Sequence, residues 1–293
     1  MRLTKERWTV LKVIEWTQGY LRARAIPSPR LESELLLSHA LGLDRVGLYL
    51  HHDMVLSPTE LERFRELIKR RTRGEPLPYI TGYKEFWSIP FRVDPSVLIP
   101  RPETEVLVEE ALRIIGLEGW TDPLVLDLGT GCGAIAVSLA KSISSGRIVA
   151  TDLSWEALAL ARENALAQGV SGRICFVQGD GLSFMKSTAG IFDQIVSNPP
   201  YVSHEEIESL QPEIRDFEPR HALDGGPDGL EFHRELLSQV PSRLKSGGWL
   251  IVEIGAGQGP KILESAEKAS WTKRVRIIRD YAGRSRALVA QKR

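Results

Sequence analysis

The chain has 293 residues, 42% of them hydrophobic and 26% charged, which predicts a globular protein of one large domain or two ordinary ones. Its 38 basic and 38 acidic residues cancel, so no overall field draws it to nucleic acid or to an anionic membrane. Two cysteines exclude a disulfide framework, and no signal peptide or membrane-spanning run is recognised, so we expect a cytoplasmic protein. The six histidines show no metal-ligand spacing, and we expect no metal.

Residues 1–75 are predicted to form a small helical domain. Apolar residues recur at helical spacing near the amino terminus. The stretch "SPTELERFRELIKRRTRG" has Ser57 as N-cap, Pro58 at the first helical position and Glu60 to complete a capping box, and Gly74 ends it. Its cluster of lysines and arginines is interpreted as a solvated helix face in preference to a nucleic-acid contact.

Residues 76–101 are rich in proline, aromatic and β-branched residues, which predicts a connector with a short β-hairpin. A third region, residues 102–293, then opens with a helix. Pro102 occupies its first position, and Glu103 and Glu105 lie in the first turn, where negative charge is favourable.

From about residue 120, strand patterns alternate with helix patterns. Five apolar runs separated by helices indicate a largely parallel sheet covered on both faces: "PLVLDLGTG", "GRIVATD", "RICFVQGD", "FDQIVSNPPY" and "GGWLIVEIG". The closing stretch "RVRIIRDYAGRSRALVAQK" predicts two strands around a turn, one of them antiparallel to the rest. The predicted fold is therefore α/β, with a mostly parallel, seven-stranded sheet.

The stretch "DLGTGCG", Asp127–Gly133, is a candidate cofactor loop between a strand and a helix. Gly129, Gly131 and Gly133 would let backbone N–H groups approach a ligand closely. The dinucleotide signature G-x-G-x-x-G is missing because Ala134 takes the place of its last glycine. Taken alone, the loop is equally compatible with a tight turn that binds nothing.

Polar side chains follow three strands of the predicted sheet. Asp152 comes after the second strand, where a carboxylate can accept both hydroxyls of a ribose, and Asp180 after the third, where it can accept from an adenine amino group. Asn198 follows the fourth strand. The carboxyl ends of parallel strands are where open α/β sheets bind ligands, so these residues predict an adenosine-bearing cofactor, S-adenosylmethionine. A second glycine loop, Glu253–Gly259, is interpreted as an ordinary strand-to-helix turn.

The stretch "SNPPY" predicts a site for a planar amino group. The Asn198 side-chain oxygen and the Pro199 carbonyl can each accept one of its N–H groups, which orients the nitrogen and favours positive charge on it. Pro200 stiffens the turn, and Tyr201 can stack on the planar group. No strong general base is required, because the proton becomes acidic only as a methyl group arrives.

Three further stretches, "LIPRPETE", "FEPRHALDGGPDGL" and "RDYAGRSR", together with these two motifs, resemble the HemK/PrmC family. The resemblance covers nearly the whole chain. It implies a class I S-adenosylmethionine-dependent methyltransferase with a Rossmann-like sheet and a small helical N-terminal domain that recognises the substrate. It also implies methylation of the glutamine side-chain amide in the Gly-Gly-Gln motif of class 1 peptide chain release factors. We expect a monomer that makes no direct contact with nucleic acid.

The resemblance also implies three groups of site residues. Cofactor contacts would come from Gly129, Thr130, Gly131, Cys132, Gly133, Asp152, Asp180, Gly181 and Asn198. The glutamine would be bound and methylated at Asn198, Pro199, Pro200 and Tyr201, with Arg101, Glu103 and Thr104 as further contacts to the cofactor. Gly181 departs from family members that carry an aromatic residue there, so stacking on adenine must come from elsewhere. Cys132 is interpreted as a small loop filler.

Three alternatives remain open from the sequence. A nucleic-acid amino-methyltransferase acting on adenine N6 or guanine N2 would use the same four residues, although the zero net charge argues against it. An NAD-dependent oxidoreductase would need the last glycine of G-x-G-x-x-G, whose place Ala134 takes in this chain. A non-catalytic adaptor that binds a translation factor would have no need of an intact Asn198–Tyr201 motif.

Overall fold

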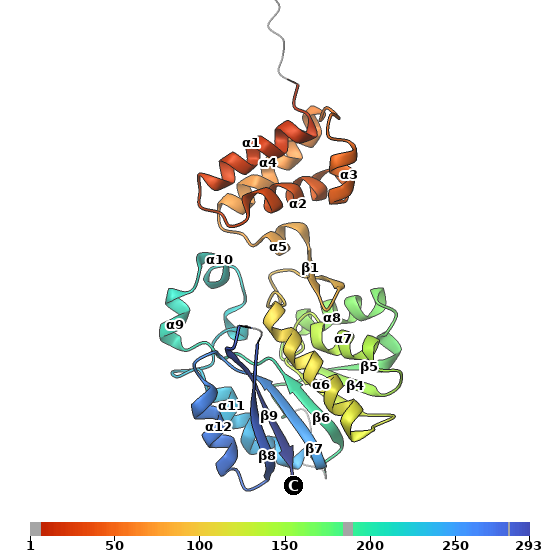
Figure 1. Cartoon of the computed structure of the whole chain (residues 1–293), viewed down its shortest axis with the longest axis vertical. Coiled ribbons are helices and arrows are strands. Elements are labelled where there is room, and N and C mark those ends of the chain that lie inside the picture. Colours follow the sequence, from red (N-terminus) through yellow and green to blue (C-terminus); the bar gives the residue numbers. More distant parts are fainter. Residues whose placement is uncertain (1–6, 184–189, 281) are drawn as a thin grey trace, which may run out of the picture. The chain divides into compact units, whose positions relative to one another are not determined.

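The structure, a computed structural model, describes residues 7–183, 190–280 and 282–293. Tyr281 of the "RDYAGRSR" stretch and the first six residues of the predicted helical domain lie outside this range. The chain forms two compact units: unit 1 is Met1–Gly82 with Pro212–Phe217, and unit 2 is Tyr83–Gln211 with Glu218–Arg293 (Figure 1). No helix in the described part of the chain is long and apolar enough to cross a membrane.

Unit 1 is helical, as the sequence predicts. Its helices are α1 Val10–Arg22, α2 Pro29–Leu41, α3 Arg45–Leu50, α4 Pro58–Thr72, α5 Leu77–Thr81 and α10 Pro212–Arg215. Helix α4 begins with the predicted capping box, in which the Ser57 hydroxyl accepts from the Glu60 N–H and the Glu60 carboxylate accepts from the Ser57 N–H. Helix α5, which the sequence placed in the connector, belongs here because Ile80 is buried in the core formed by α1, α2 and α4.

The basic cluster of α4 differs from its predicted role at one position. Arg71 is buried, and its guanidinium binds Glu32 of α2 and Glu213 of α10 at 2.6 and 2.7 Å. A buried charge must be paired, so this arginine joins the two helices and does not face solvent. Arg70 pairs with Glu75 but stays partly exposed, in keeping with a solvated helix face.

Unit 2 carries the β-structure. Its elements are β1 Tyr83–Phe86, β2 Ile89–Arg92, η1 Pro102–Thr104, α6 Glu105–Glu118, β3 Leu124–Leu128, α7 Ala134–Ser142, β4 Arg147–Asp152, α8 Trp155–Ala167, η2 Ser171–Arg173, β5 Ile174–Gln178, β6 Phe192–Ser197, α9 His204–Ser209, η3 Arg220–Ala222, α11 Glu231–Gln239, η4 Val240–Ser242, β7 Leu244–Glu253, α12 Gly259–Lys268, β8 Thr272–Arg279 and β9 Ser285–Lys292. Strands β1 and β2 form the predicted antiparallel hairpin.

The large sheet has seven strands in the order β5-β4-β3-β6-β7-β9-β8. All neighbours from β5 to β7 are parallel, and β9 pairs antiparallel with both β7 and β8. The predicted antiparallel strand is thus confirmed. The register pairs Leu128 with both Thr151 and Ser197, which aligns the carboxyl ends of β4, β3 and β6 at one edge of the sheet.

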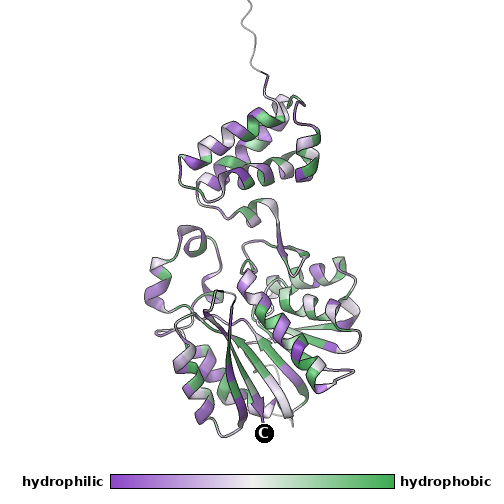
Figure 2. Cartoon of the chain, in the orientation of Figure 1, coloured by the Kyte–Doolittle hydropathy of each residue, from purple (hydrophilic) through white to green (hydrophobic). Residues whose placement is uncertain are grey.

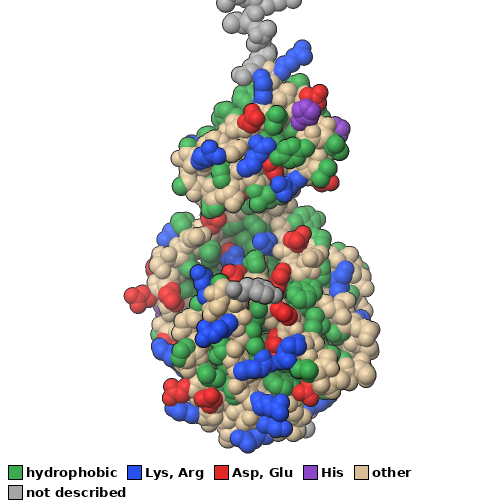
Figure 3. Space-filling model, in the orientation of Figure 1, with side chains coloured by type: hydrophobic (Ala, Val, Ile, Leu, Met, Phe, Trp, Pro, Cys, Tyr) green, Lys and Arg blue, Asp and Glu red, His purple; other side chains and the backbone are tan. Residues whose placement is uncertain are grey.

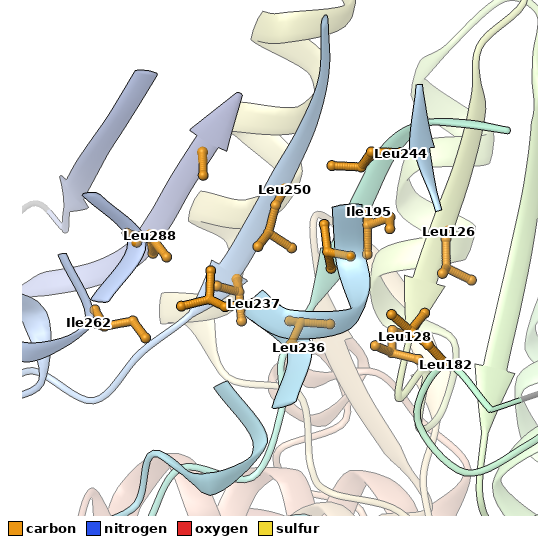
Figure 4. Packing of buried hydrophobic residues seen from close by; sticks show 14 of the residues in the cluster. Leu126, Leu128, Leu182, Ile195, Leu236, Leu237, Leu244, Leu250, Ile262 and Leu288 are labelled. Atoms are coloured by element: carbon orange, nitrogen blue, oxygen red, sulfur yellow. The ribbon is translucent and has the colours of Figure 1, made fainter. Parts of the chain in front are cut away.

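Helices cover both faces of this sheet (Figure 1). Side chains alternate along β3, so Leu126 and Leu128 join a buried cluster with residues of α11 and α12 (Figure 4). Asp127 faces the other way, towards α7, which packs with α6 and α8 on that side. Figure 2 shows hydrophobic residues concentrated on the strands and interspersed with hydrophilic ones along the covering helices. Burial of each such leucine is worth about 1.5–3 kcal/mol relative to exposure.

Candidate active site

A cavity of about 230 Å³ opens in unit 2 where β3, β4 and β6 end. Most of the residues that the sequence singles out contribute to its lining: Thr104, Gly129, Thr130, Gly131, Cys132, Asp152, Asp180, Gly181, Asn198, Pro199 and Pro200. The structure does not place Arg101, Glu103, Gly133 or Tyr201 in that lining. One cavity is therefore lined by the glycine loop, the Asn-Pro-Pro turn and the aspartates that end β4 and follow β5.

The glycine loop has the backbone conformation that its sequence predicts. Gly129, Gly131 and Gly133 have φ values of 74°, 55° and 85°, which side chains rarely adopt. A Cβ on Gly129 or Gly131 would meet no protein atom within 4 Å, whereas one on Gly133 would lie 3.2 Å from the Cβ of Ala161. The first two glycines leave the cavity side open, and the third allows α8 to pack closely.

Asp152 connects the loop to the end of β4. Its Oδ2 accepts a hydrogen bond from the Gly131 N–H at 2.8 Å, and its Oδ1 accepts from the Ser154 N–H at 3.0 Å. Each carboxylate oxygen has a second lone pair, so both can still accept from a ligand hydroxyl. The loop is also held by the Thr151 carbonyl, which accepts from Gly129 and Thr130.

Asp127 has a structural role that the sequence analysis missed. Its Oδ2 accepts from the Thr130 hydroxyl at 2.6 Å and from the Ala136 N–H at 3.0 Å, which fixes the loop to the first turn of α7. The side chain is completely buried, and burial raises its pKa to about 7 against the lowering effect of those two bonds. A lone acid within the apolar run "LVLDLG" is the signal that could have revealed it.

Cys132 agrees with the loop-filler interpretation. Burial raises the pKa of its thiol to about 12, which disfavours a reactive thiolate. Its backbone carbonyl accepts from the Asn164 amide of α8 at 2.8 Å.

The Asn-Pro-Pro turn presents two acceptors at the end of β6. The Asn198 side-chain Nδ2 donates to the hydroxyl of Thr104 at 3.2 Å. The amide oxygen is therefore the end of the side chain that is left to face the cavity. Within the described ranges, no hydrogen bond occupies the Pro199 carbonyl.

Tyr201 and the second glycine loop form a support behind this turn. The Tyr201 hydroxyl donates to Oε1 of Glu253 at 3.1 Å, and its backbone carbonyl accepts from the Gln258 amide at 2.8 Å. Burial raises the pKa of the Tyr201 phenol, and the neighbouring Glu253 raises it further. The loop Glu253–Gly259 contributes nothing to the cavity lining among the described residues, but it holds Tyr201 in place and is more than an ordinary turn.

The glycines of "DGGPDGL" pack against the same turn. A Cβ on Gly225 would lie 2.7 Å from the Cα of Tyr201, and one on Gly229 would lie 2.3 Å from its carbonyl oxygen. The Val202 and Gly225 backbones are also hydrogen-bonded to each other at 2.8 Å. These contacts explain why this stretch is rich in glycine.

The outer residues of "LIPRPETE" connect the remaining stretches. Arg101 pairs with the buried Glu218 of "FEPRHALD". Oε1 of Glu103 lies 3.9 Å from Nη2 of Arg286, which belongs to "RDYAGRSR". Burial raises the pKa of Glu218 although Arg101 lowers it. Arg101 and Glu103 thus link segments around the cavity, and Thr104 is the member of this group that lines it.

Sequence reasoning missed part of the lining. Residues 96–98, Pro100, His221, Ala222 and Phe232 also line the cavity. Phe232 lines the cavity together with Gly181, so it brings a phenyl ring to the region where this chain lacks the expected aromatic residue. A partly buried ring on an amphipathic helix has no feature in sequence that separates it from a core residue.

Comparisons with known proteins find matches for both parts of the chain. Residues 12–82 match the family described as the PrmC N-terminal domain, and residues 104–214 match the methyltransferase small domain. A release factor glutamine methyltransferase from Geobacter sulfurreducens is 48% identical over 258 residues, which cover 88% of each chain. One from Rhodopirellula baltica is 43% identical and aligns over 97% of each chain.

A solved structure supports the fold. The Thermus thermophilus 16S rRNA N2 G1207 methyltransferase (RsmC), in complex with AdoMet and guanosine, superposes with a TM-score of 0.52. The alignment covers 72% of this chain and 50% of that one at 19% identity, so it speaks for the fold alone. The predicted class I methyltransferase fold with a helical N-terminal domain is confirmed.

Proposed function

The chain belongs to the release factor glutamine methyltransferase family, and from that premise we propose that it methylates peptide chain release factors of class 1. The acceptor is the side-chain amide nitrogen of the glutamine in their Gly-Gly-Gln motif. S-adenosylmethionine is the methyl donor.

The cavity fits an adenosyl cofactor by the chemistry of its donors. Gly129 and Gly131 have no side chain to exclude a ligand, and the Asp152 carboxylate retains acceptor capacity for two ribose hydroxyls. Asp180 would accept from the adenine amino group, and the Phe232 ring would pack on the base in place of the aromatic residue absent at Gly181. When bound, the cofactor supplies a methyl group on a positively charged sulfur.

Asn198 and Pro199 orient the acceptor nitrogen. An amide nitrogen is a poor nucleophile, because its lone pair is delocalised. Two carbonyl oxygens that accept its two N–H groups fix its position and stabilise the positive charge that develops on it. Pro200 stiffens the turn. Stacking by Tyr201 stays a prediction, because its side chain is not in the cavity lining and its hydroxyl is bonded to Glu253.

A single observation carries the proposal. Asn198 and Pro199 line the same cavity as the glycine loop and Asp152. Charge favours a protein substrate over a nucleic acid: on the face of unit 2 in Figure 3, Lys and Arg are interspersed with Asp and Glu, whereas phosphate contacts need a basic track.

The three regions of the chain have separate roles in this proposal. We propose that residues 1–75 recognise the release factor, that residues 76–101 connect them to the catalytic region at 102–293, and that the protein acts as a cytoplasmic monomer. Exposed apolar side chains on α3, namely Val46, Tyr49 and Leu50, offer unit 1 a surface for a protein partner.

Partition of a labelled methyl group tests the function. The protein and cofactor carrying a labelled methyl are incubated with a release factor, with its Gly-Gly-Gln Gln→Ala variant, and with RNA or DNA. We expect label on the wild-type release factor alone. Label on nucleic acid, or equal label on the Gln→Ala variant, would replace the proposal with a nucleic-acid amino-methyltransferase or with another acceptor.

A further inference from the structure

Glu253 is a buried acid that does not touch the cavity in which the proposed reaction takes place. It ends β7 with no solvent exposure, behind the Asn-Pro-Pro turn and outside the cavity lining. Its Oε1 accepts from the Tyr201 hydroxyl at 3.1 Å, whereas its buried Oε2 has no hydrogen-bond partner among the described residues. An acid in such a place costs stability, so its presence calls for a functional explanation.

Thr104 is a neighbour of both Asn198 and Glu253. Thr104 is buried, and its Oγ1 accepts the hydrogen bond from Asn198 Nδ2 at 3.2 Å. The single hydrogen of that hydroxyl must point elsewhere. Thr104 is close enough to the Glu253 carboxyl to lower its pKa, and Oε2 accepts from no other donor in the described part of the chain.

We propose that Glu253 is a positioning residue whose carboxylate fixes the orientation of the Asn198 amide through the Thr104 hydroxyl. A carboxylate can only accept, so a hydrogen bond between the two requires Thr104 to donate, and Thr104 must then accept from Asn198. The Asn198 oxygen is thereby turned to the cavity, where it can accept from the glutamine of the release factor. The consequence for catalysis rests on the proposed function. The orientation of the Asn198 amide does not depend on that function.

Protonation of Glu253 removes this constraint. A carboxylic acid can donate to Thr104, which can then donate to the Asn198 oxygen, and the amide would present its NH₂ group to the cavity. An NH₂ group cannot accept from the substrate amide, so this orientation is unproductive.

Several groups around Glu253 set its protonation. Burial is the main cause that raises its pKa to about 7, and the Thr104 and Tyr201 hydroxyls oppose the shift. Arg286 of β9 also lowers this pKa, whereas Glu103 of the η1 turn raises it. The ring of His233 from α11 is hydrogen-bonded to the backbone carbonyl of Glu253, at 2.7 Å. Arg286 is itself paired with Asp280.

Turnover measured against pH tests the inference. In the wild type, kcat should fall about tenfold per pH unit below about pH 7 as Glu253 becomes protonated. Glu253→Gln can donate to Thr104 at any pH, so its kcat should be lower by roughly 10–100-fold, a loss typical of removing an outer partner of a functional group, and should not change with pH. The affinity for S-adenosylhomocysteine should stay within a few-fold of wild type. Glu118→Gln is the matched control, because exposed Glu118 is bonded to Trp249 of β7 and Gln291 of β9 and lies outside the cavity lining, so this change should leave both kcat and its pH dependence unchanged.

Thr104 provides a second pair of variants in case Glu253→Gln does not fold. Thr104→Val removes the connecting hydroxyl and should lower kcat and abolish its pH dependence. Thr104→Ser keeps the hydroxyl and should restore both. A wild-type pH profile in Thr104→Val, or in a folded Glu253→Gln, would overturn the inference.

The side-chain amide resonances of Asn198 separate this inference from the proposed function. In ¹⁵N-labelled protein, assigned by their loss in Asn198→Ala, they should shift with a midpoint near pH 7 in the wild type and not in Thr104→Val. This shift without any methylation of release factor would support the positioning role and refute the proposed substrate. Methylation without the shift would refute the positioning role alone.

Discussion

Removal of the Asp152 carboxylate should weaken cofactor binding far more than any other single change in the cavity. In Asp152→Ala, a ribose loses two charge-assisted hydrogen bonds, each worth about 1.5–3 kcal/mol. Their sum of about 3–6 kcal/mol corresponds to roughly 10²–10⁴ in the dissociation constant. Because Asp152 is half-buried and water competes for its oxygens, we expect the lower end, about 10²-fold.

The same change also acts on the protein. The Gly131 and Ser154 N–H groups lose their acceptor, so the loop becomes less well held before any ligand arrives. Asp152→Asn separates the two contributions. An amide keeps one oxygen acceptor, but its NH₂ group must then face one of the two backbone donors, so we expect a loss smaller than in Asp152→Ala.

Calorimetric titration with S-adenosylhomocysteine, which is not consumed, measures the effect. Asp122→Ala is a matched control, because this exposed aspartate precedes β3 and lies outside the cavity lining. Circular dichroism establishes that each variant is folded. A dissociation constant within about threefold of wild type in a folded Asp152→Ala protein would remove Asp152 from the cofactor site.

Three other changes have distinct expected outcomes. Asn198→Ala should lower kcat by roughly 10²–10³-fold, by comparison with the loss of an oxyanion-hole donor, and should change cofactor affinity only a few-fold. A single-turnover rate within a few-fold of wild type would contradict the role of Asn198. Burial raises the pKa of Asp127 to about 7, above its unfolded value of about 3.9, so its contribution to stability is present at acidic pH and is lost as the pH rises through 7. The Tm of Asp127→Asn should therefore fall less than that of the wild type between about pH 5 and pH 8. An equal fall in Tm would refute this. Val46→Asp with Leu50→Asp on α3 should raise KM for release factor and leave cofactor affinity unchanged, and an unaltered KM would show that this surface is not used.

The largely parallel character of the sheet and the main acceptors of the cavity could be predicted because each depends on local signals. A strand that ends in Asp152 or in Asn198 is recognisable from its apolar run and the polar residue that follows. The glycines at 129 and 131 are recognisable because a positive φ leaves few alternatives. Parallel strands then bring their carboxyl ends together, so the meeting of these residues follows from topology.

The supports of the cavity could not be predicted, because they depend on contacts between distant segments. Glu253 and Tyr201 are 52 positions apart, and Thr104 and Asn198 are 94 apart. Nothing in "EIGAGQG" alone tells whether its acid faces a ligand or a tyrosine. The Arg71–Glu213 pair spans 142 positions, and for that reason a basic helix face could be mistaken for a solvated one.

Fragmentation mass spectrometry of the methylated release factor tests the central claim most directly. After incubation of intact factor with this protein and S-adenosylmethionine, we expect one added methyl group, located on the side-chain nitrogen of the glutamine in the Gly-Gly-Gln motif. A methyl group located on the backbone or on another residue would contradict the account. So would the absence of any added methyl group from the release factor while the protein still binds the cofactor.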